Sequence, residues 1–177
     1  VLGFTFKYRE DPIFLDPRNK KLGARLIINL EKLYLSLKKL NLSSSNKDDY
    51  YKNSSKLGIP QSFNNKLQLK LFGIEFNLEE LNGLDFKKGC YIGQENTSRI
   101  KNKNKLNKRL LPLKVLSGNL NEGDPIIKDS IEIGKILING KQSYGLIKFT
   151  DKKFDFDFKF QSGSSSLMVV KPEWIKF

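Results

Sequence analysis

Apolar positions follow two different periods along the chain. In the first part they recur every three or four residues, which lines one face of a helix and predicts an amphipathic helix with a Lys-rich outer face. This apolar face comprises Leu30, Leu33, Tyr34, Leu37 and Leu40. After Arg109 the pattern changes to short alternating runs separated by glycines, which is typical of strands.

The other elements predicted in the first part are short. The predicted strands cover residues 1–8 and 24–29, and the predicted helices cover residues 47–57, 78–81 and 95–100. Asp11-Pro12 breaks the first strand, because proline lacks the N–H that a sheet ladder needs. Gly58 and Pro60 stop the helix before them, and Asn77 has the side chain of an N-cap for the helix after it.

The second part contains no helical period. Its predicted strands cover residues 110–116, 125–127, 131–138, 143–149, 154–160 and 167–170. The clearest of them is F-D-F-D-F-K-F, residues 154–160, in which a period of two places the phenylalanines inward. Several short strands with turn signals between them predict a small barrel or sandwich.

Composition removes several kinds of chemistry. The 177 residues contain no histidine, so His general bases, His-dependent nucleophilic triads and His-containing zinc sites are excluded. The single cysteine, Cys90, excludes an internal disulfide and a Cys₄ zinc or iron–sulfur site, and no metal site is expected. A lone thiol fits a reducing compartment, from which we expect a cytoplasmic location.

Charge and hydropathy bear on the partners. The formal net charge of +13 attracts anions, and the densest cationic run extends from Lys101 to Arg109. That run lacks the interleaved aromatic residues of a nucleic-acid surface, so direct nucleic-acid binding is not expected. Apolar runs stay far below the roughly 20 residues of a membrane helix, so no membrane partner is expected either.

One segment combines residues that can carry chemistry. It reads K-G-C-Y-I-G-Q-E and consists of Lys88, Gly89, Cys90, Tyr91, Ile92, Gly93, Gln94 and Glu95. The two glycines let the backbone turn sharply around a thiol and an aromatic ring, and an amide and a carboxylate follow. On composition alone, the lone cysteine would be read as a small buried hydrophobe.

The segment resembles the signature of the YgfZ-type folate-binding proteins. These are relatives of the glycine-cleavage T protein (GcvT), an aminomethyltransferase, and they include a mitochondrial iron–sulfur assembly factor. Further landmarks of that family are matched, in the same order, by Asp16-Pro17-Arg18, Leu22-Gly23, Tyr50-Tyr51, Leu57-Gly58-Ile59-Pro60 and Gly73-Ile74-Glu75. The aminomethyltransferases typically have a degenerate version of the signature that lacks the cysteine.

The resemblance implies an α+β fold in two parts. Residues 1–110 would be the C-terminal portion of a GcvT-like folate-binding domain, and residues 111–177 would be a small antiparallel β-barrel. Family members begin with a further segment, in which the aminomethyltransferases carry their catalytic Asp. Since the first residues look like the interior of a domain, we expect this sequence to be a fragment.

The resemblance also implies roles for four residues, each with a plainer alternative. Glu75 would accept the two parallel N–H donors of a pterin edge, unless it is a solvated surface carboxylate. Tyr91 would stack on the folate, or pack the loop down. Arg99 would face the anionic tail of the folate, or pair with Glu95. Cys90 would act in redox or transfer chemistry, aided by the neighbouring lysines.

The resemblance implies a folate-binding accessory protein that supports iron–sulfur cluster assembly or repair and, through the enzymes it serves, tRNA modification. The implied cofactor is tetrahydrofolate or a related folate, and the implied partners are folate and iron–sulfur proteins. Whether the chain catalyses a reaction stays open, and the alternative is a tetrahydrofolate-dependent aminomethyltransferase of glycine cleavage. A basic nucleic-acid-binding protein is a third hypothesis.

Overall fold

The computed structural model describes residues 5–8, 11–60, 67, 70–102, 106–149 and 154–176. They form two compact units, one up to Leu57 and one from Gly58. The predicted α+β class is confirmed, because the described residues contain three α-helices and a closed six-stranded barrel. The predicted division into domains at residues 110 and 111 stays a prediction.

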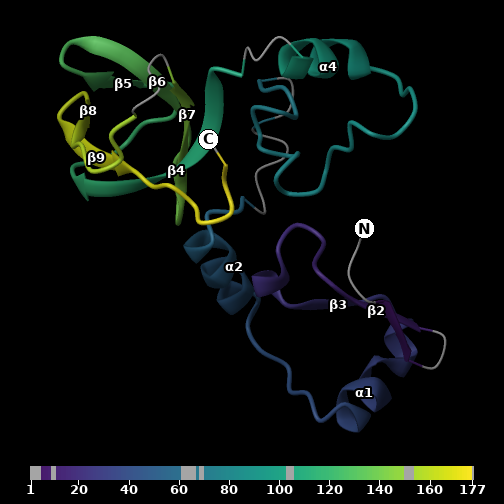
Figure 1. Cartoon of the computed structure of the whole chain (residues 1–177). Coiled ribbons are helices and arrows are strands. Elements are labelled where there is room, and N and C mark those ends of the chain that lie inside the picture. Colours follow the sequence, from purple (N-terminus) through teal and green to yellow (C-terminus); the bar gives the residue numbers. More distant parts are fainter. Residues whose placement is uncertain are drawn as a thin grey trace. The chain divides into compact units, whose positions relative to one another are not determined.

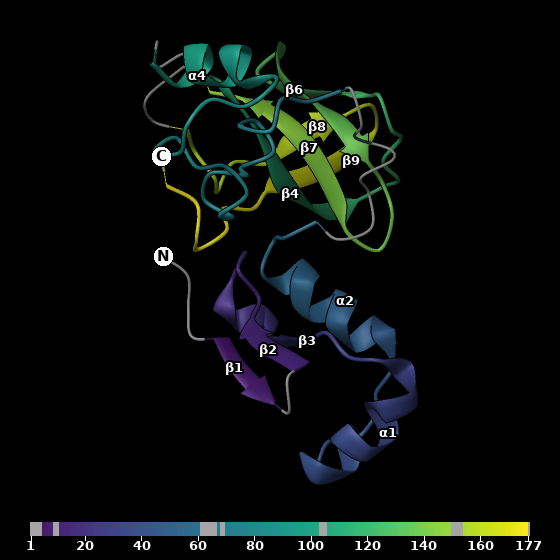
Figure 2. The same cartoon turned by 90° about the vertical axis from the view of Figure 1, so that its right-hand side faces the viewer.

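The first unit combines a small antiparallel sheet with two helices (Figure 2). Its elements are β1 (Thr5–Tyr8), β2 (Asp11–Leu15), η1 (Lys20–Leu22), β3 (Ala24–Leu26), α1 (Leu30–Lys39) and α2 (Lys47–Lys56). Both α-helices begin after an asparagine, since the side chains of Asn29 and Asn46 each accept a hydrogen bond from the backbone two residues later. These caps fix the helix starts that the sequence predicts.

Asp11-Pro12 is the beginning of a strand, whereas the sequence pattern predicts only a break there. Strand β2 starts at Asp11 and is the central strand of the sheet, paired with β1 and β3. Pro12 pairs only with Lys7 of β1, because the pairing with β3 starts at Ile13. The proline therefore lies near the end of its strand, where a missing N–H is tolerated. The predicted strand over 24–29 is shorter than expected and ends at Leu26.

The second unit is built around the barrel (Figure 1). Its strands are β4 (Lys108–Ser117), β5 (Pro125–Lys128), β6 (Ile131–Ile138), β7 (Ser143–Lys148), β8 (Phe160–Ser162) and β9 (Ser165–Val169). They are hydrogen-bonded in the order β4-β7-β6-β5-β8-β9, and β9 returns to β4 to close the barrel. Every pair is antiparallel, so the predicted barrel is confirmed.

Side-chain alternation along the strands separates a barrel core from a second apolar cluster. Leu111 and Leu113 of β4 belong to the core, whereas Leu110 belongs to the second cluster. In β6, Ile136 faces the core but Ile138 joins the second cluster, although residues two positions apart on a regular strand point to the same face. A register shift between them accounts for this, because a β-bulge re-aims the side chains that follow it.

The second cluster holds a preceding segment of the chain against the barrel. Leu67 is buried with Leu110, Ile138 and Tyr144, and Leu71 and Phe76 pack against this group. The predicted helix over 78–81 is not formed, and residues 73–82 make successive turns instead. Asn77 is not an N-cap: it is buried with a positive φ of 62°, and its Nδ2 donates to the Leu110 carbonyl oxygen at 2.8 Å.

The predicted strand over 154–160 is largely wrong in its backbone, while its side-chain pattern holds. Only Phe160 enters a strand, β8, and residues 154–159 form turns and irregular structure. Phe154, Phe156 and Phe158 nevertheless pack against the barrel core, and the two aspartates between them are exposed. The rings of Phe154 and Phe160 are stacked, with centroids 5.5 Å apart.

Candidate functional site

The K-G-C-Y-I-G-Q-E loop leads into helix α4 (Gln94–Asn102), and the side chain of the first helical residue folds back onto it. The backbone N–H of Tyr91 donates to Gln94 Oε1 at 3.1 Å, and the backbone N–H of Gln94 donates to the Tyr91 carbonyl oxygen at 3.3 Å. Gly93 closes the turn with a φ of 82°, a conformation that favours glycine. The loop therefore has a defined backbone geometry.

Side chains of the loop differ sharply in exposure. Cys90 is a free, exposed thiol, so the reading of a small buried hydrophobe does not apply. Ile92 is fully exposed, whereas Tyr91 is half-buried. The Nζ of Lys88 lies 4.5 Å from the centroid of the Tyr91 ring, in a cation–π contact. The loop thus presents its thiol to solvent and holds its aromatic ring against a lysine.

Glu75 lies in the turn segment that packs on the barrel. Its carboxylate oxygen Oε2 accepts a hydrogen bond from the backbone N–H of Phe72 at 3.0 Å, and its carbonyl oxygen accepts one from Leu110 N at 2.8 Å. The other oxygen, Oε1, has no hydrogen-bond partner among the described residues. The side chain is half-buried, and one face of its carboxylate is left for a donor.

Ion pairs connect the turn segment to both helix α4 and strand β4. Lys101 Nζ lies 2.6 Å from Glu79 Oε1, and Arg109 Nη1 pairs with Glu80 and donates to Asn77 Oδ1. Two members of the cationic run are thus neutralised locally. The part of the run at residues 103–105 lies outside the described residues.

The structure brings some of the predicted site residues together and leaves others apart. Tyr91 contacts both Lys88 and Gln94, and Cys90 directly precedes it in the chain. Arg99 is exposed on α4 and forms no ion pair with Glu95 or another described residue. Within the described part of the chain, no hydrogen bond or ion pair joins Glu75 to the loop. The roles assigned to these residues stay predictions.

The described residues form neither a metal-binding cluster nor a membrane-spanning helix. No three His, Cys, Asp or Glu side chains gather in a way that could hold a metal ion in the described part of the chain. None of the helices described here has both the length and the apolar character needed to cross a membrane.

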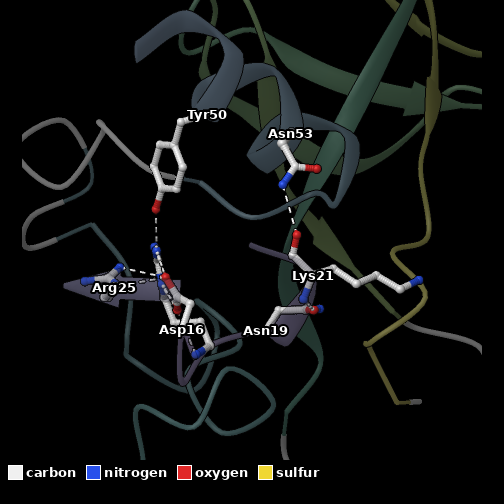
Figure 3. Close-up of polar contacts among 7 residues, drawn as sticks. Asp16, Asn19, Lys21, Arg25, Tyr50 and Asn53 are labelled. Carbon is white, nitrogen blue, oxygen red and sulfur yellow. Dashed lines mark hydrogen bonds and ion pairs between the residues drawn. The ribbon is translucent and has the colours of Figure 1, made fainter. Parts of the chain in front are cut away.

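A buried carboxylate in the first unit was not assigned a role from the sequence. Asp16 is 2% exposed, its Oδ1 accepts from Arg18 Nε at 3.0 Å, and its Oδ2 accepts from Arg25 Nε at 2.8 Å (Figure 3). Arg18 Nη2 bonds both Asp16 Oδ2, at 2.7 Å, and the Tyr50 hydroxyl, at 2.9 Å. Burial alone would raise the pKa of Asp16, but the hydrogen bonds from the two arginines lower it to about 2.

This network ties the sheet of the first unit to helix α2, and a second bond reinforces the link. Asn53 Nδ2 donates to the carbonyl oxygen of Lys21 in η1 at 3.0 Å (Figure 3). The D-P-R and Tyr50-Tyr51 landmarks of the sequence contain three of the network's members. Arg18 and Tyr50 are 32 residues apart, so the sequence did not show that their side chains are in contact.

Comparison with known proteins gives related sequences but no family model, since none matches this chain. The chain is 36% identical over 127 residues to the mitochondrial iron-sulfur cluster assembly factor IBA57 homolog of Dictyostelium discoideum, covering 64% of this chain and 31% of that protein. It is 34% identical over 97 residues to the Neurospora crassa homolog, covering 55% of this chain and 22% of that protein. Against mitochondrial IBA57 of Mus musculus it is 34% identical over 100 residues, covering 56% and 27%.

These matches limit what can be carried over and correct one prediction. The matched part spans less than a third of the length of each of these relatives. The prediction of a cytoplasmic location is wrong, because the relatives are all named as mitochondrial proteins. A lone thiol indicates a reducing environment, and that condition does not single out one compartment.

Proposed function

We propose that this chain acts in iron–sulfur cluster assembly in mitochondria, as part of a YgfZ-type folate-binding accessory protein. The names of its relatives support the process and the compartment. The observation that carries the proposal is the exposed Cys90, held in the K-G-C-Y-I-G-Q-E loop at the start of α4. A role in tRNA modification would follow indirectly, through iron–sulfur enzymes that depend on this protein.

The exposed thiol is the group through which the chain would meet its clients. A single cysteine does not hold an iron–sulfur cluster, which needs four ligands. Cys90 can supply one ligand or one redox-active sulfur to a site that a partner completes. Its exposure supports such a contact, since a partner's cluster must approach the sulfur directly.

Folate binding forms the second part of the proposal. Glu75, Tyr91 and Arg99 would bind tetrahydrofolate or a related folate through the pterin edge, the ring face and the anionic tail. Glu75 Oε1 has no partner among the described residues, and a carboxylate can accept paired N–H donors, which supports this role. The half-buried ring of Tyr91 and the exposed guanidinium of Arg99 are both open to a ligand.

The role of Cys90 is tested by complementation. Full-length protein carrying Cys90→Ser would be expressed in Dictyostelium cells that lack their own relative, and the activities of mitochondrial iron–sulfur enzymes would be measured. We expect wild-type protein to restore these activities and the variant to fail at equal abundance. Restoration by Cys90→Ser to the wild-type level would refute the proposal.

Folate binding is tested by calorimetry on the full-length protein with tetrahydrofolate. Replacing Glu75 by Gln removes the charge from the proposed pterin contact, so we expect affinity to fall about tenfold or more. The matched control is Glu132→Gln, which changes an exposed carboxylate paired with Lys148 on the barrel and should leave affinity unchanged. Equal affinities for Glu75→Gln and wild type would remove Glu75 from the site.

A further inference from the structure

We propose that Gln94 is a positioning residue, whose side chain fixes the direction in which Cys90 is presented. The inference rests on the proposed function of Cys90 and concerns how that thiol is held. It assigns to the glutamine of the loop a structural contact within the protein, with no contact to the folate or to a client.

The argument starts from the peptide bond between Cys90 and Tyr91. Its N–H belongs to Tyr91 and donates to Gln94 Oε1 at 3.1 Å. A peptide group is planar, so a bond that orients this N–H also restrains the rotation about the Cα–C bond of Cys90. The Gln94 side chain therefore restrains the ψ torsion of Cys90, which sets the direction of the turn that follows.

Gln94 holds the following peptide as well. Its own backbone N–H donates to the carbonyl oxygen of Tyr91 at 3.3 Å, so one residue engages both backbone polar groups of Tyr91. Gln94 is itself the first residue of helix α4, and Lys101 joins that helix to Glu79. The loop is thus anchored to a regular element instead of being held by its own flexible residues.

Most of the residues directly around Cys90 are exposed, so packing does little there to fix the thiol and the polar bond carries the restraint. Cys90 is exposed, Ile92 is fully exposed, and a Cβ built on Gly89 would meet no atom within 4 Å. Glycines on both sides also widen the conformations open to an unrestrained chain. The ammonium of Lys88 lies 4.5 Å from the centroid of the Tyr91 ring and engages the ring, whereas Gln94 engages the Cys90–Tyr91 peptide.

Two variants separate positioning from direct contact. Gln94→Leu keeps the size of the side chain and removes the acceptor for Tyr91 N–H, whereas Gln94→Glu keeps an acceptor oxygen and removes the amide NH₂. The matched control is Gln142→Leu, because Gln142 is a half-buried glutamine of the barrel unit whose Nε2 donates to the Leu113 carbonyl oxygen at 3.4 Å. All would be made in the full-length protein, with far-UV circular dichroism as a check on folding.

The first measurement is hydrogen exchange at the Tyr91 amide, and the second is restoration of iron–sulfur enzyme activity in cells. We expect Gln94→Leu to speed exchange at Tyr91 at least tenfold and to lower restoration towards that of Cys90→Ser. Gln94→Glu should keep both close to wild type, as should Gln142→Leu. An unchanged exchange rate or unchanged restoration in Gln94→Leu would overturn the inference.

Loss of activity in Gln94→Glu with slow Tyr91 exchange would also overturn it, because the amide NH₂ would then contact the ligand or the client directly. Failure of the proposed function gives a different result. If Cys90→Ser restores activity fully, the function assigned to the thiol is refuted, while the exchange rates of the Gln94 variants still decide whether Gln94 holds the loop.

Discussion

Replacing Asp16 by Asn would test how far one buried carboxylate stabilises the first unit. Asp16 is 2% exposed and accepts hydrogen bonds from Arg18 and Arg25. Its pKa falls from the usual 3.8 to about 2 in the folded protein. That difference corresponds to about 2 kcal/mol of folding free energy. Because the variant also removes the carboxylate that half-buried Arg18 and exposed Arg25 share, we expect a loss of about 2–4 kcal/mol.

The sign of the pH dependence follows from the direction of the shift. A carboxyl group whose pKa is lower in the folded state stabilises the fold above its unfolded pKa. This contribution is therefore complete above about pH 4 and is lost as the pH falls towards 2. Asp16→Asn has no such group to titrate, so its stability should fall less over this range than that of the wild type.

Urea unfolding followed by two probes would locate the effect. Far-UV circular dichroism reports on the helices, of which α1 and α2 lie in the first unit and the shorter α4 in the second, and Trp174, the single tryptophan, packs on the barrel core. With m-values of roughly 1–3 kcal/mol/M, the helical transition of Asp16→Asn should move by on the order of 1 M urea, while the Trp174 transition stays in place.

The control is Asp49→Asn, which changes an exposed carboxylate on α2 and should move neither transition appreciably. A helical transition of Asp16→Asn that coincides with the wild type would refute the reasoning. So would an acid sensitivity in the variant equal to that of the wild type between pH 4 and 2.

Three further predictions concern the barrel unit. A Cβ at Gly134 would lie 2.5 Å from a backbone carbonyl oxygen of β7, so Gly134→Ala should lower unfolding free energy by about 1–3 kcal/mol in urea titrations followed by Trp fluorescence. A Cβ at Gly140 meets no atom within 4 Å, so Gly140→Ala should leave the unfolding free energy unchanged. Equal losses for the two substitutions would contradict a clash at Gly134. Leu111→Ala opens a cavity in the core and should cost about 2–5 kcal/mol by the same assay, against a much smaller loss for half-exposed Leu116→Ala. Exposed Cys90 should react with one equivalent of a thiol reagent as fast in the folded protein as in urea, and slow reaction in the folded state would show that it is covered.

Local signals were sufficient for much of the fold. The predicted starts of α1 and α2 agree with the structure because apolar spacing and loop composition are local signals, and the structure adds an asparagine cap before each helix that the prediction did not use. The barrel strands were found because alternation and glycine turns are also local. Strand β2 was missed because Asp11-Pro12 was read only as a break.

Contacts between distant residues account for what the sequence did not show. Asn77 looks like a helix cap, but its side chain bonds Leu110, 33 residues away, and the backbone takes a positive φ there. At the site, the motif identified the loop that carries Cys90, while the bond from Tyr91 to Gln94 depends on the turn that the folded loop adopts. The anchoring of Glu75 through Leu110 likewise depends on the packing of the turn segment against β4.

Strand β4 has a practical consequence for any attempt to divide the protein. It pairs with β7 along its first half and with β9 along its second half, so a cut between residues 110 and 111 would divide a strand that closes the barrel. The part of β7 that pairs with residues 108–110 would lose its partner, and such an open sheet edge pairs readily with other chains and aggregates. The same cut would also remove Leu110, which stays bonded to Glu75 and Asn77 in the first piece, from the barrel. Separation between residues 57 and 58 leaves both sheets intact, and we expect soluble pieces from that position alone.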